Sequence, residues 1–546
     1  MLILKKSLWL NLAMALSVAL CLTACGGSSS NGNAGSSTTT ITGSIFAAPV
    51  SGASVSVKDT NGNVIAGPES TDSNGEYSIS IPNANLGQDL VLESTGGSFM
   101  DEATGTSTSA NTLTAYVPAN SLSSGSQIHA TPGSTIIERL MTQHSMTRTQ
   151  AETVFQNAFV YTPDVSLAPT DATDPTAGAS TDEKLEGLRA AVFSQMASDL
   201  GLTAADQFQL MASLADDLAD GQLDGQDSNG AIMIPGTTVA LKSDISNRFA
   251  LALEHFRTGN DHSGLTADQL GALPFAKVAL SDSYRFEYVA GMMAAAEGKT
   301  QFKIKVTDAD TGAIPQTGLS LSLMAMMHMA TMNHSAPDTD CVESSTPGTY
   351  DCTVFYLMPS QMMNTTMGYW QLKVMAGSES AVFYPTVNMA MNGNGKIQLK
   401  GQSGDLIAGM MAGSTEHRTY YIFKDSVSGT TGNHMIKLFV AAKVSMMSFP
   451  TAYVGQTLSS QDDPSHVLNI SSMNVEVSTD GANWVGADGS SNDGYWTTVS
   501  GISGLADGVE GNLYVKLTVN GEQKTTDGAV PAGDGSNDYA TITFAP

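Results

Sequence analysis

The stretch Leu319-Ser-Leu-Ser-Leu-Met-Ala-Met-Met-His-Met329 begins with the strict alternation of a half-buried β-strand. Since successive side chains of a strand point to opposite faces, a strand here places Met324, Met326 and His328 on one face, and Met327 with Met329 on the other. Similar short strands, separated by Gly, Asp and Asn turns, are predicted over 285–289, 301–306, 370–374, 437–440 and 513–519. This spacing predicts two Ig-like β-sandwiches, over 276–400 and 414–546, with their boundary near residues 401–413.

A further group of short strands is predicted over residues 40–95, where apolar and polar residues alternate between the turns Asp59-Thr-Asn-Gly62 and Asp72-Ser-Asn-Gly75. The stretches Ala48-Pro-Val-Ser-Gly-Ala53 and Thr71-Asp-Ser-Asn-Gly-Glu-Tyr77 resemble the carboxypeptidase-regulatory-like family, which has a transthyretin-type β-sandwich. The resemblance implies a spacer or docking module over residues 41–105, without a catalytic group.

The middle of the chain follows a helical period instead. Thr147-x-x-Gln150 has the form of a capping box and is followed by apolar residues on one helical face. Further helices are predicted from Asp182, from Thr203 and over 244–256. Residues 110–275 therefore read as a helical bundle, and the whole chain as a multidomain, mainly β protein with this bundle between its sandwiches.

The N-terminus carries an export signal: Lys5 and Lys6 precede an uncharged apolar run over 8–22 that is too short to span a bilayer comfortably. Leu22-Thr-Ala-Cys25 resembles a bacterial lipobox, which implies removal of residues 1–24 and lipidation of Cys25. Residues 25–40, rich in Gly, Ser and Thr, would be the tether. Several acyl chains on one cysteine anchor a protein stably. Because Gly26 follows the cysteine, we expect a lipid-anchored protein of the outer membrane or cell surface. Attachment at the periplasmic face of the membrane is the alternative.

Of the four cysteines, only Cys341 and Cys352 remain after the signal and the lipidated residue are set aside. In an oxidising compartment they are expected to form a structural disulfide. The formal net charge of −28 argues against nucleic acid as a partner.

Methionine gathers around two histidines in Met326-Met-His328-Met-Ala-Thr-Met332-Asn-His334. Thioether sulfur together with imidazole selects copper, Cu(I) especially, because soft ligands match a soft ion. The alternative is that these methionines only fill gaps in a core and that the histidines are hydrogen-bonded at the surface.

The same stretch, followed by Gly348-Thr-Tyr350, Phe355-Tyr-Leu-Met-Pro359 and Trp370-Gln-Leu-Lys-Val374, resembles the YtkA-like or FixH-like exported β-sandwich family. The resemblance implies a setting of copper handling and oxidase assembly, with a copper-handling or electron-transfer protein as partner. The predicted copper ligands are Met326, His328, Met329, Met332, His334 and Met358.

Two weaker candidates remain. His434, Met446 and Met447 form a second soft ligand set, for which an ordinary strand end is the competing interpretation. The acidic run from Asp216 to Gly230 lacks the spacing of a calcium loop, so we expect a solvated helix end rather than a calcium site.

The sequence contains no phosphate-binding loop, no dinucleotide fingerprint, no H-E-x-x-H and no G-x-S-x-G. We therefore expect a binding protein rather than an enzyme. A copper-binding lipoprotein is the leading hypothesis, and a structural or interaction lipoprotein without a metal site is the alternative. A carbohydrate-binding module ranks below both, because only Trp484 and Trp496 offer a stacking platform.

Overall fold

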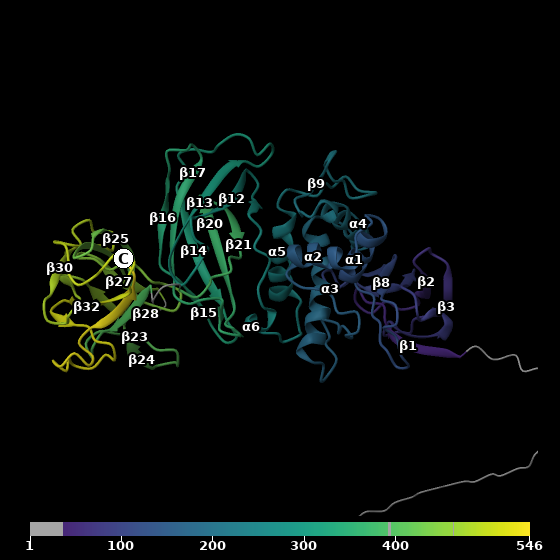
Figure 1. Ribbon diagram of the computed structural model, residues 1–546, viewed down its shortest axis with the longest axis horizontal. Helices are drawn as coiled ribbons and strands as arrows, with labels where there is room; N and C mark the ends of the chain where they lie inside the picture. Colours follow the sequence, from purple (N-terminus) through teal and green to yellow (C-terminus); the bar gives the residue numbers. More distant parts are fainter. Residues whose placement is uncertain (1–36, 391–394, 462) are drawn as a thin grey trace, which may run out of the picture.

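The computed structural model describes residues 37–390, 395–461 and 463–546. Strand pairing and three main hydrophobic cores distinguish an N-terminal body (37–273), a central sandwich (278–390) and a C-terminal domain (395–546), although two of the cores include side chains from a neighbouring body. The three lie in a row (Figure 1). The predicted mainly β, multidomain fold is confirmed. The predicted signal and Cys25 lie outside the described residues.

The N-terminal body begins with a β part. Its strands are β1 (Thr38–Ser44), β2 (Ser54–Asp59), β3 (Val64–Ser70), β4 (Glu76–Pro82), β5 (Leu90–Thr95), β6 (Ser98–Met100), β7 (Ser107–Ser109) and β8 (Leu113–Val117). β1 pairs with β4, β6 with β7, and a second sheet has the order β3-β2-β5-β8. Bridges from Thr42 to Gln127 and from Ile45 to Ala130 return the chain to β1. The β part thus reaches residue 130, and the expected helical range of 110–275 begins too early.

The helical part of this body contains six α-helices among the described residues: α1 (Pro132–Thr142), α2 (Arg148–Phe159), α3 (Thr181–Asp199), α4 (Gln207–Asp217), α5 (Ile245–Gly259) and α6 (Ala267–Leu270). A short hairpin, β9 (Gln226–Asp227) and β10 (Gly230–Ala231), follows α4. The predicted capping box is confirmed, because Thr147 caps α2 and its side chain accepts a hydrogen bond from Gln150 N. Strands and helices share one core, so the bundle is no separate domain.

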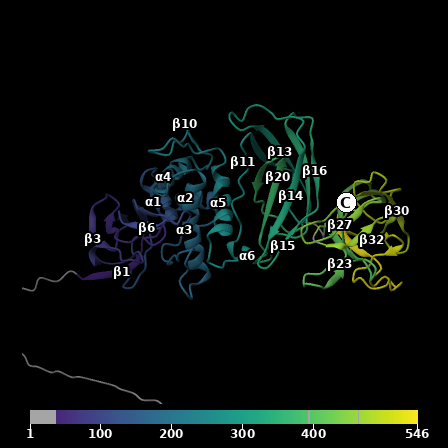
Figure 2. The same ribbon diagram turned by 180° about the vertical axis from the view of Figure 1, so that it is seen from behind.

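The central sandwich has the strand order β11-β12-β13-β17-β16-β14-β20-β21, with β15 paired to β14. The strands are β11 (Val278–Leu280), β12 (Tyr284–Ala290), β13 (Gly298–Asp308), β14 (Leu321–His328), β15 (Asn333–Ser335), β16 (Asp338–Glu343), β17 (Thr349–Tyr356), β18 (Gln361–Met362), β19 (Thr365–Thr366), β20 (Tyr369–Ala376) and β21 (Glu379–Phe383). The strands of its two layers are paired at Leu321 of β14 and Cys341 of β16. Helix α5 lies beside the sandwich (Figures 1 and 2), and Asn247 Nδ2 donates to Val382 O over 2.9 Å.

The C-terminal domain has the strand order β22-β25-β26-β31-β30-β29-β32-β33, with β34 paired to β32. Its strands are β22 (Lys396–Lys400), β23 (Leu406–Ala408), β24 (Thr415–His417), β25 (Thr419–Thr430), β26 (Asn433–Ala442), β27 (Thr457–Ser460), β28 (Asp463–Asn469), β29 (Met473–Ser478), β30 (Val485–Asp488), β31 (Tyr495–Thr498), β32 (Gly511–Val519), β33 (Glu522–Gln523) and β34 (Ala540–Phe544). Ile397 and Leu399 of β22 belong to this domain's core. The boundary therefore falls before residue 396 and not at 401–413, because β22 pairs with β25.

Candidate metal centre

Strand β14 separates the predicted copper ligands. Its residues alternate between buried and half-buried along the whole strand, which confirms the predicted alternation. Met327 points into the core of the sandwich, whereas Met326 and His328 lie on the opposite face. The six predicted ligands therefore do not converge on one point.

His334 is brought onto the core face by a reversal of the chain. The turn after β14 is closed by Met329 N, which donates to Met332 O over 3.2 Å. β15 then pairs antiparallel with β14, and His334 stands opposite Met327. Residues directly opposite each other in such a pair share a face. His334 is accordingly buried against the sandwich core.

The imidazole of His334 faces the thioether of Met358. Nε2 lies 3.2 Å from Sδ of Met358, while Nδ1 lies 2.8 Å from the carbonyl oxygen of Ser335. A carbonyl only accepts, so Nδ1 carries the proton, and the neutral ring then has a lone pair on Nε2. Burial lowers the pKa of His334, which keeps the ring neutral. Two electron-pair donors thus face each other with no proton between them.

Trp370 holds this pair in place. Its ring packs edge-on against the His334 ring with centroids 5.4 Å apart, and Nε1 donates to Met358 O over 3.1 Å. Trp370 is completely buried and therefore has little freedom to move. The side chains of Met329, Met358 and Met367 pack against the same core.

His328 occupies a different environment, at the interface with the N-terminal body. Its ring stacks on Tyr369 with centroids 4.9 Å apart. The Tyr369 hydroxyl accepts from Arg257 Nη1 over 2.8 Å and donates to Glu254, both on α5. Burial lowers the pKa of His328, and its Nε2 has no hydrogen-bond partner among the described residues. His328 and Met326 therefore do not join His334 and Met358.

The second predicted ligand set is also divided. His434 lies at the start of β26, where its Nε2 is 3.2 Å from Asp507 Oδ1, and Met446 and Met447 follow the other end of that strand. Ser335 N donates to Met446 O over 3.0 Å, so the Met446–Met447 turn lies beside β15 and His334. The structure therefore places the turn that carries two members of this set beside β15, which the sequence pattern alone did not indicate.

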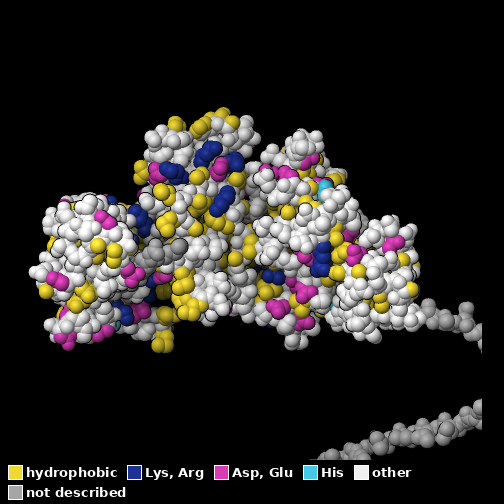
Figure 3. All heavy atoms as spheres, in the orientation of Figure 1, with side chains coloured by type: hydrophobic (Ala, Val, Ile, Leu, Met, Phe, Trp, Pro, Cys, Tyr) yellow, Lys and Arg dark blue, Asp and Glu magenta, His cyan; other side chains and the backbone are white. Residues whose placement is uncertain are grey.

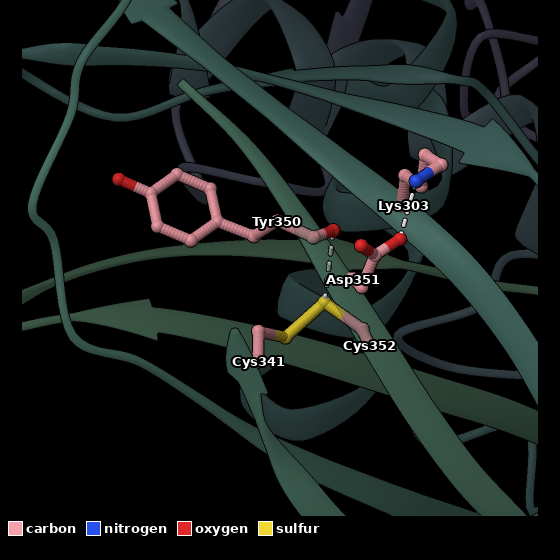
Figure 4. The surroundings of a disulfide bond; sticks show 5 residues. All are labelled: Lys303, Cys341, Tyr350, Asp351 and Cys352. Carbon is pink, nitrogen blue, oxygen red and sulfur yellow. Dashed lines mark hydrogen bonds and ion pairs between the residues drawn. A yellow bond between two sulfur atoms is a disulfide. The ribbon is translucent and has the colours of Figure 1, made fainter. Parts of the chain in front are cut away.

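The predicted disulfide is confirmed. Cys341 of β16 and Cys352 of β17 are bonded, with an S–S distance of 2.06 Å (Figure 4). The bond joins neighbouring strands at the point where β16 also pairs with β14 of the other layer. Beside it, Lys303 and Asp351 form an ion pair at the surface.

The acidic run after α4 folds around Asp217. This side chain is buried and accepts hydrogen bonds from Gly225 N and Gln226 N, whereas Asp220 and Asp227 are exposed, as expected of a solvated helix end. Burial raises the pKa of Asp217 to about 7. Within the described residues, no three His, Cys, Asp or Glu side chains are grouped so as to hold a metal ion.

A cleft that the sequence did not reveal lies between the β part and the helical part of the N-terminal body. Its volume is about 1200 Å³, and its walls come from residues 42–78 and 127–183. Six carboxylates line it, together with Gln127 and the buried His129, whose Nδ1 accepts from Ser44 N. No local sequence signal marks such a cleft, because its two walls are far apart along the chain.

No described helix is long and apolar enough to cross a membrane. No family model matches the sequence, and no curated protein matches it.

Among solved structures, the chain is similar to the titin domains Z1Z2 in complex with telethonin at 11% identity, covering 49% of this chain and 98% of that chain with a TM-score of 0.13. A titin A168169 structure is 7% identical and covers 46% of this chain and 99% of that chain, with a TM-score of 0.13. An endo-fucoidan hydrolase of glycoside hydrolase family 107 gives 9% identity, 62% and 51% coverage and a TM-score of 0.13. Likenesses this weak carry no argument about function.

Proposed function

We propose that this chain is an exported, lipid-anchored protein that binds copper as Cu(I) between His334 and Met358. The observation that carries the proposal is the contact of 3.2 Å between the His334 Nε2 lone pair and the Met358 sulfur. Two electron-pair donors at this distance gain nothing from each other, whereas a soft cation between them is bound by both. A neutral imidazole and a thioether need not lose a proton before they bind a metal.

The resemblance of this stretch to YtkA-like domains supports the same proposal, and so does export to a compartment where thioethers outlast free thiols. Met329 and Met367 are candidates for a third ligand, because they are half-buried and pack against the same core as Met358. Met332, in the turn before His334, is a further candidate. Met326 and His328 are left out of the proposed site, since they lie on the other face of β14. A copper-handling or electron-transfer protein is the proposed partner.

The test is a competition titration of the secreted chain with Cu(I) under reducing conditions, and with Ag(I) as a probe that does not change its oxidation state. His334→Gln and Met358→Leu remove one donor each at nearly constant volume. Met326→Leu and His328→Gln are matched controls on the other face of the strand. We expect tight binding to be lost in the first pair of variants and kept in the second.

Equal binding by all four variants, or none by the wild type, would overturn the proposal. The second result leaves a tethered structural or interaction lipoprotein without a metal site. Lipidation is tested separately, by incorporation of labelled palmitate into the wild type and its loss in Cys25→Ala.

A further inference from the structure

One end of the central sandwich gathers methionines from five separate segments. We call this the methionine end and define it by Met292, Met293, Met329, Met332, Met358, Met362, Met363, Met367, Met389, Met446 and Met447. β14 ends here, β13 and β20 begin here, and the turn after β12 closes it. Figure 3 shows hydrophobic side chains gathered at the lower end of the sandwich on the face in view.

Hydrogen bonds and a close approach hold the five segments together. Asn388 N donates to Ala295 O over 2.9 Å, which ties the segment of Met389 to the turn of Met292 and Met293. Ser360 N donates to Val387 O over 2.7 Å, which adds the hairpin of Met362 and Met363.

The remaining segments join at residue 368 and at β15. A Cβ added to Gly368 would lie 1.8 Å from His328 O, so the β14–β15 turn lies directly against this point. The bond from Ser335 N to Met446 O brings in the turn of the C-terminal domain.

Burial increases from the rim of this end toward His334. Met292 is fully exposed and Met363 is 83% exposed, and Met293, Met362, Met389 and Met447 are also exposed. Met329, Met332, Met367 and Met446 are half-buried, and His334 is buried. Methionines therefore occur at each level of burial between the solvent and the proposed copper ligands.

The exposed apolar side chains at this end carry sulfur. The large exposed hydrophobic side chains of the five segments are methionines. A thioether is a soft ligand for Cu(I), whereas Leu, Ile and Phe of similar size offer a metal ion no electron-pair donor. Thioethers are also uncharged, so many of them can lie close together without repulsion.

We propose that the methionine end is a second, multivalent site for soft monovalent cations, which collects Cu(I) at its rim and passes it to His334 and Met358. This inference rests on the proposed function of that pair. Each step is a ligand exchange in which one bond from the metal to a thioether sulfur, or at the last step to His334 Nε2, forms as a sulfur–metal bond breaks. No electron or proton is transferred, and the oxidation state of the metal is unchanged.

The test uses Ag(I) and the secreted chain, with methionine methyl groups labelled by ¹³C. A rim variant changes Met292, Met293, Met362, Met363 and Met389 to Leu, which keeps the apolar surface but removes the sulfur. A control variant, Met100→Leu with Met233→Leu, changes two exposed methionines of the N-terminal body. A pair variant, His334→Gln with Met358→Leu, removes the tight site.

We expect the wild type and the control to bind several Ag(I) per chain, with the rim methyl signals shifting in the weak phase of the titration. The rim variant should keep one tight ion, lose the weak ones and load several-fold more slowly. The pair variant should keep the weak ions and lose the tight one. A wild-type stoichiometry of one, or a rim variant identical to the wild type, would overturn the inference while leaving the proposed function intact.

Discussion

Asp405 is the residue whose replacement should most strongly destabilise the C-terminal domain. Its carboxylate is buried between two buried cations, with Oδ1 2.8 Å from Arg418 Nε and Oδ2 2.8 Å from Lys524 Nζ. The Tyr420 hydroxyl also donates to Oδ2 over 2.7 Å. Arg418 in turn donates to Lys443 O, so the cluster holds the chain shortly before Met446.

Asp405→Asn keeps the shape of the side chain and removes the charge. It leaves two buried cations with too little compensation, and breaking a buried ion pair in this way costs about 3–5 kcal/mol. For a domain of this size that corresponds to a drop in melting temperature of roughly 6–20 °C. Asp351→Asn is the matched control, because its partner Lys303 is exposed and such pairs contribute less than about 1 kcal/mol.

The pH dependence of this difference has a definite sign. Burial alone would raise the pKa of Asp405, but the adjacent ammonium of Lys524 and the hydrogen bonds from Lys524, Tyr420 and Arg418 outweigh it, so the pKa lies below 3.8. The stabilisation is therefore complete above pH 3.8 and is lost as the pH falls through the lower pKa of the folded state.

Hydrogen exchange of β25 and β26 peptides, with thermal melts at pH 7 and below pH 4, measures the Asp405 effect. A variant as stable as Asp351→Asn at pH 7, or a difference that does not shrink in acid, would refute the reasoning.

Three further outcomes are expected. Gly368→Ala should abolish tight Ag(I) binding and lower the melting temperature, because its Cβ would lie 1.8 Å from the His328 backbone oxygen at a φ of +142°. Gly377→Ala meets no neighbouring atom but has a φ of +63°, so it should cost only about 1–2 kcal/mol. Burial lowers the pKa of His129 to about 4, and an NMR titration of its ring should find that value. The unfolded chain takes up the proton at a higher pH, so the free energy of unfolding of the N-terminal body should fall by up to about 3 kcal/mol as the pH falls from 6.5 to 4. A His129 that titrates near pH 6.5 would contradict this. Tyr369→Phe removes the hydroxyl that contacts Glu254, so the free energy of unfolding measured in urea should fall by about 1–3 kcal/mol. Ag(I) binding should stay unchanged. Weakened binding would show that the two faces of β14 are coupled.

The strand pattern could be predicted from the sequence because side-chain alternation is local. The capping box of α2 could be predicted because it needs only two residues three positions apart. The pairing of Cys341 with Cys352 could be predicted because no other cysteine was left for either of them. The helical range began too early because β8 is held by its non-local pairing with β5. The sandwich boundary was misplaced because β22 belongs to a sheet formed by later strands.

The ligand set illustrates the same limit at the site itself. On one continuous strand, His328 and His334 would share a face, because their numbers differ by an even count. The turn between Met329 and Met332 reverses the chain, and the register opposite Met327 turns His334 to the other face. The soft residues in the sequence can therefore predict the chemistry of such a site. Which of them face each other depends on the register of one short hairpin, which the sequence pattern does not give.

The surroundings of the proposed site indicate how a metal would reach it. The outer face of β14 is covered around His328 by Tyr369 and α5, and the inner face is the sandwich core. The Met446 turn of the C-terminal domain covers β15 from a third direction. The exposed turns of Met292, Met363 and Met389 lie at the remaining end, where thioethers face solvent. A metal donor would therefore have to approach at the methionine end, and the same residues that accept the ion would form the surface it meets.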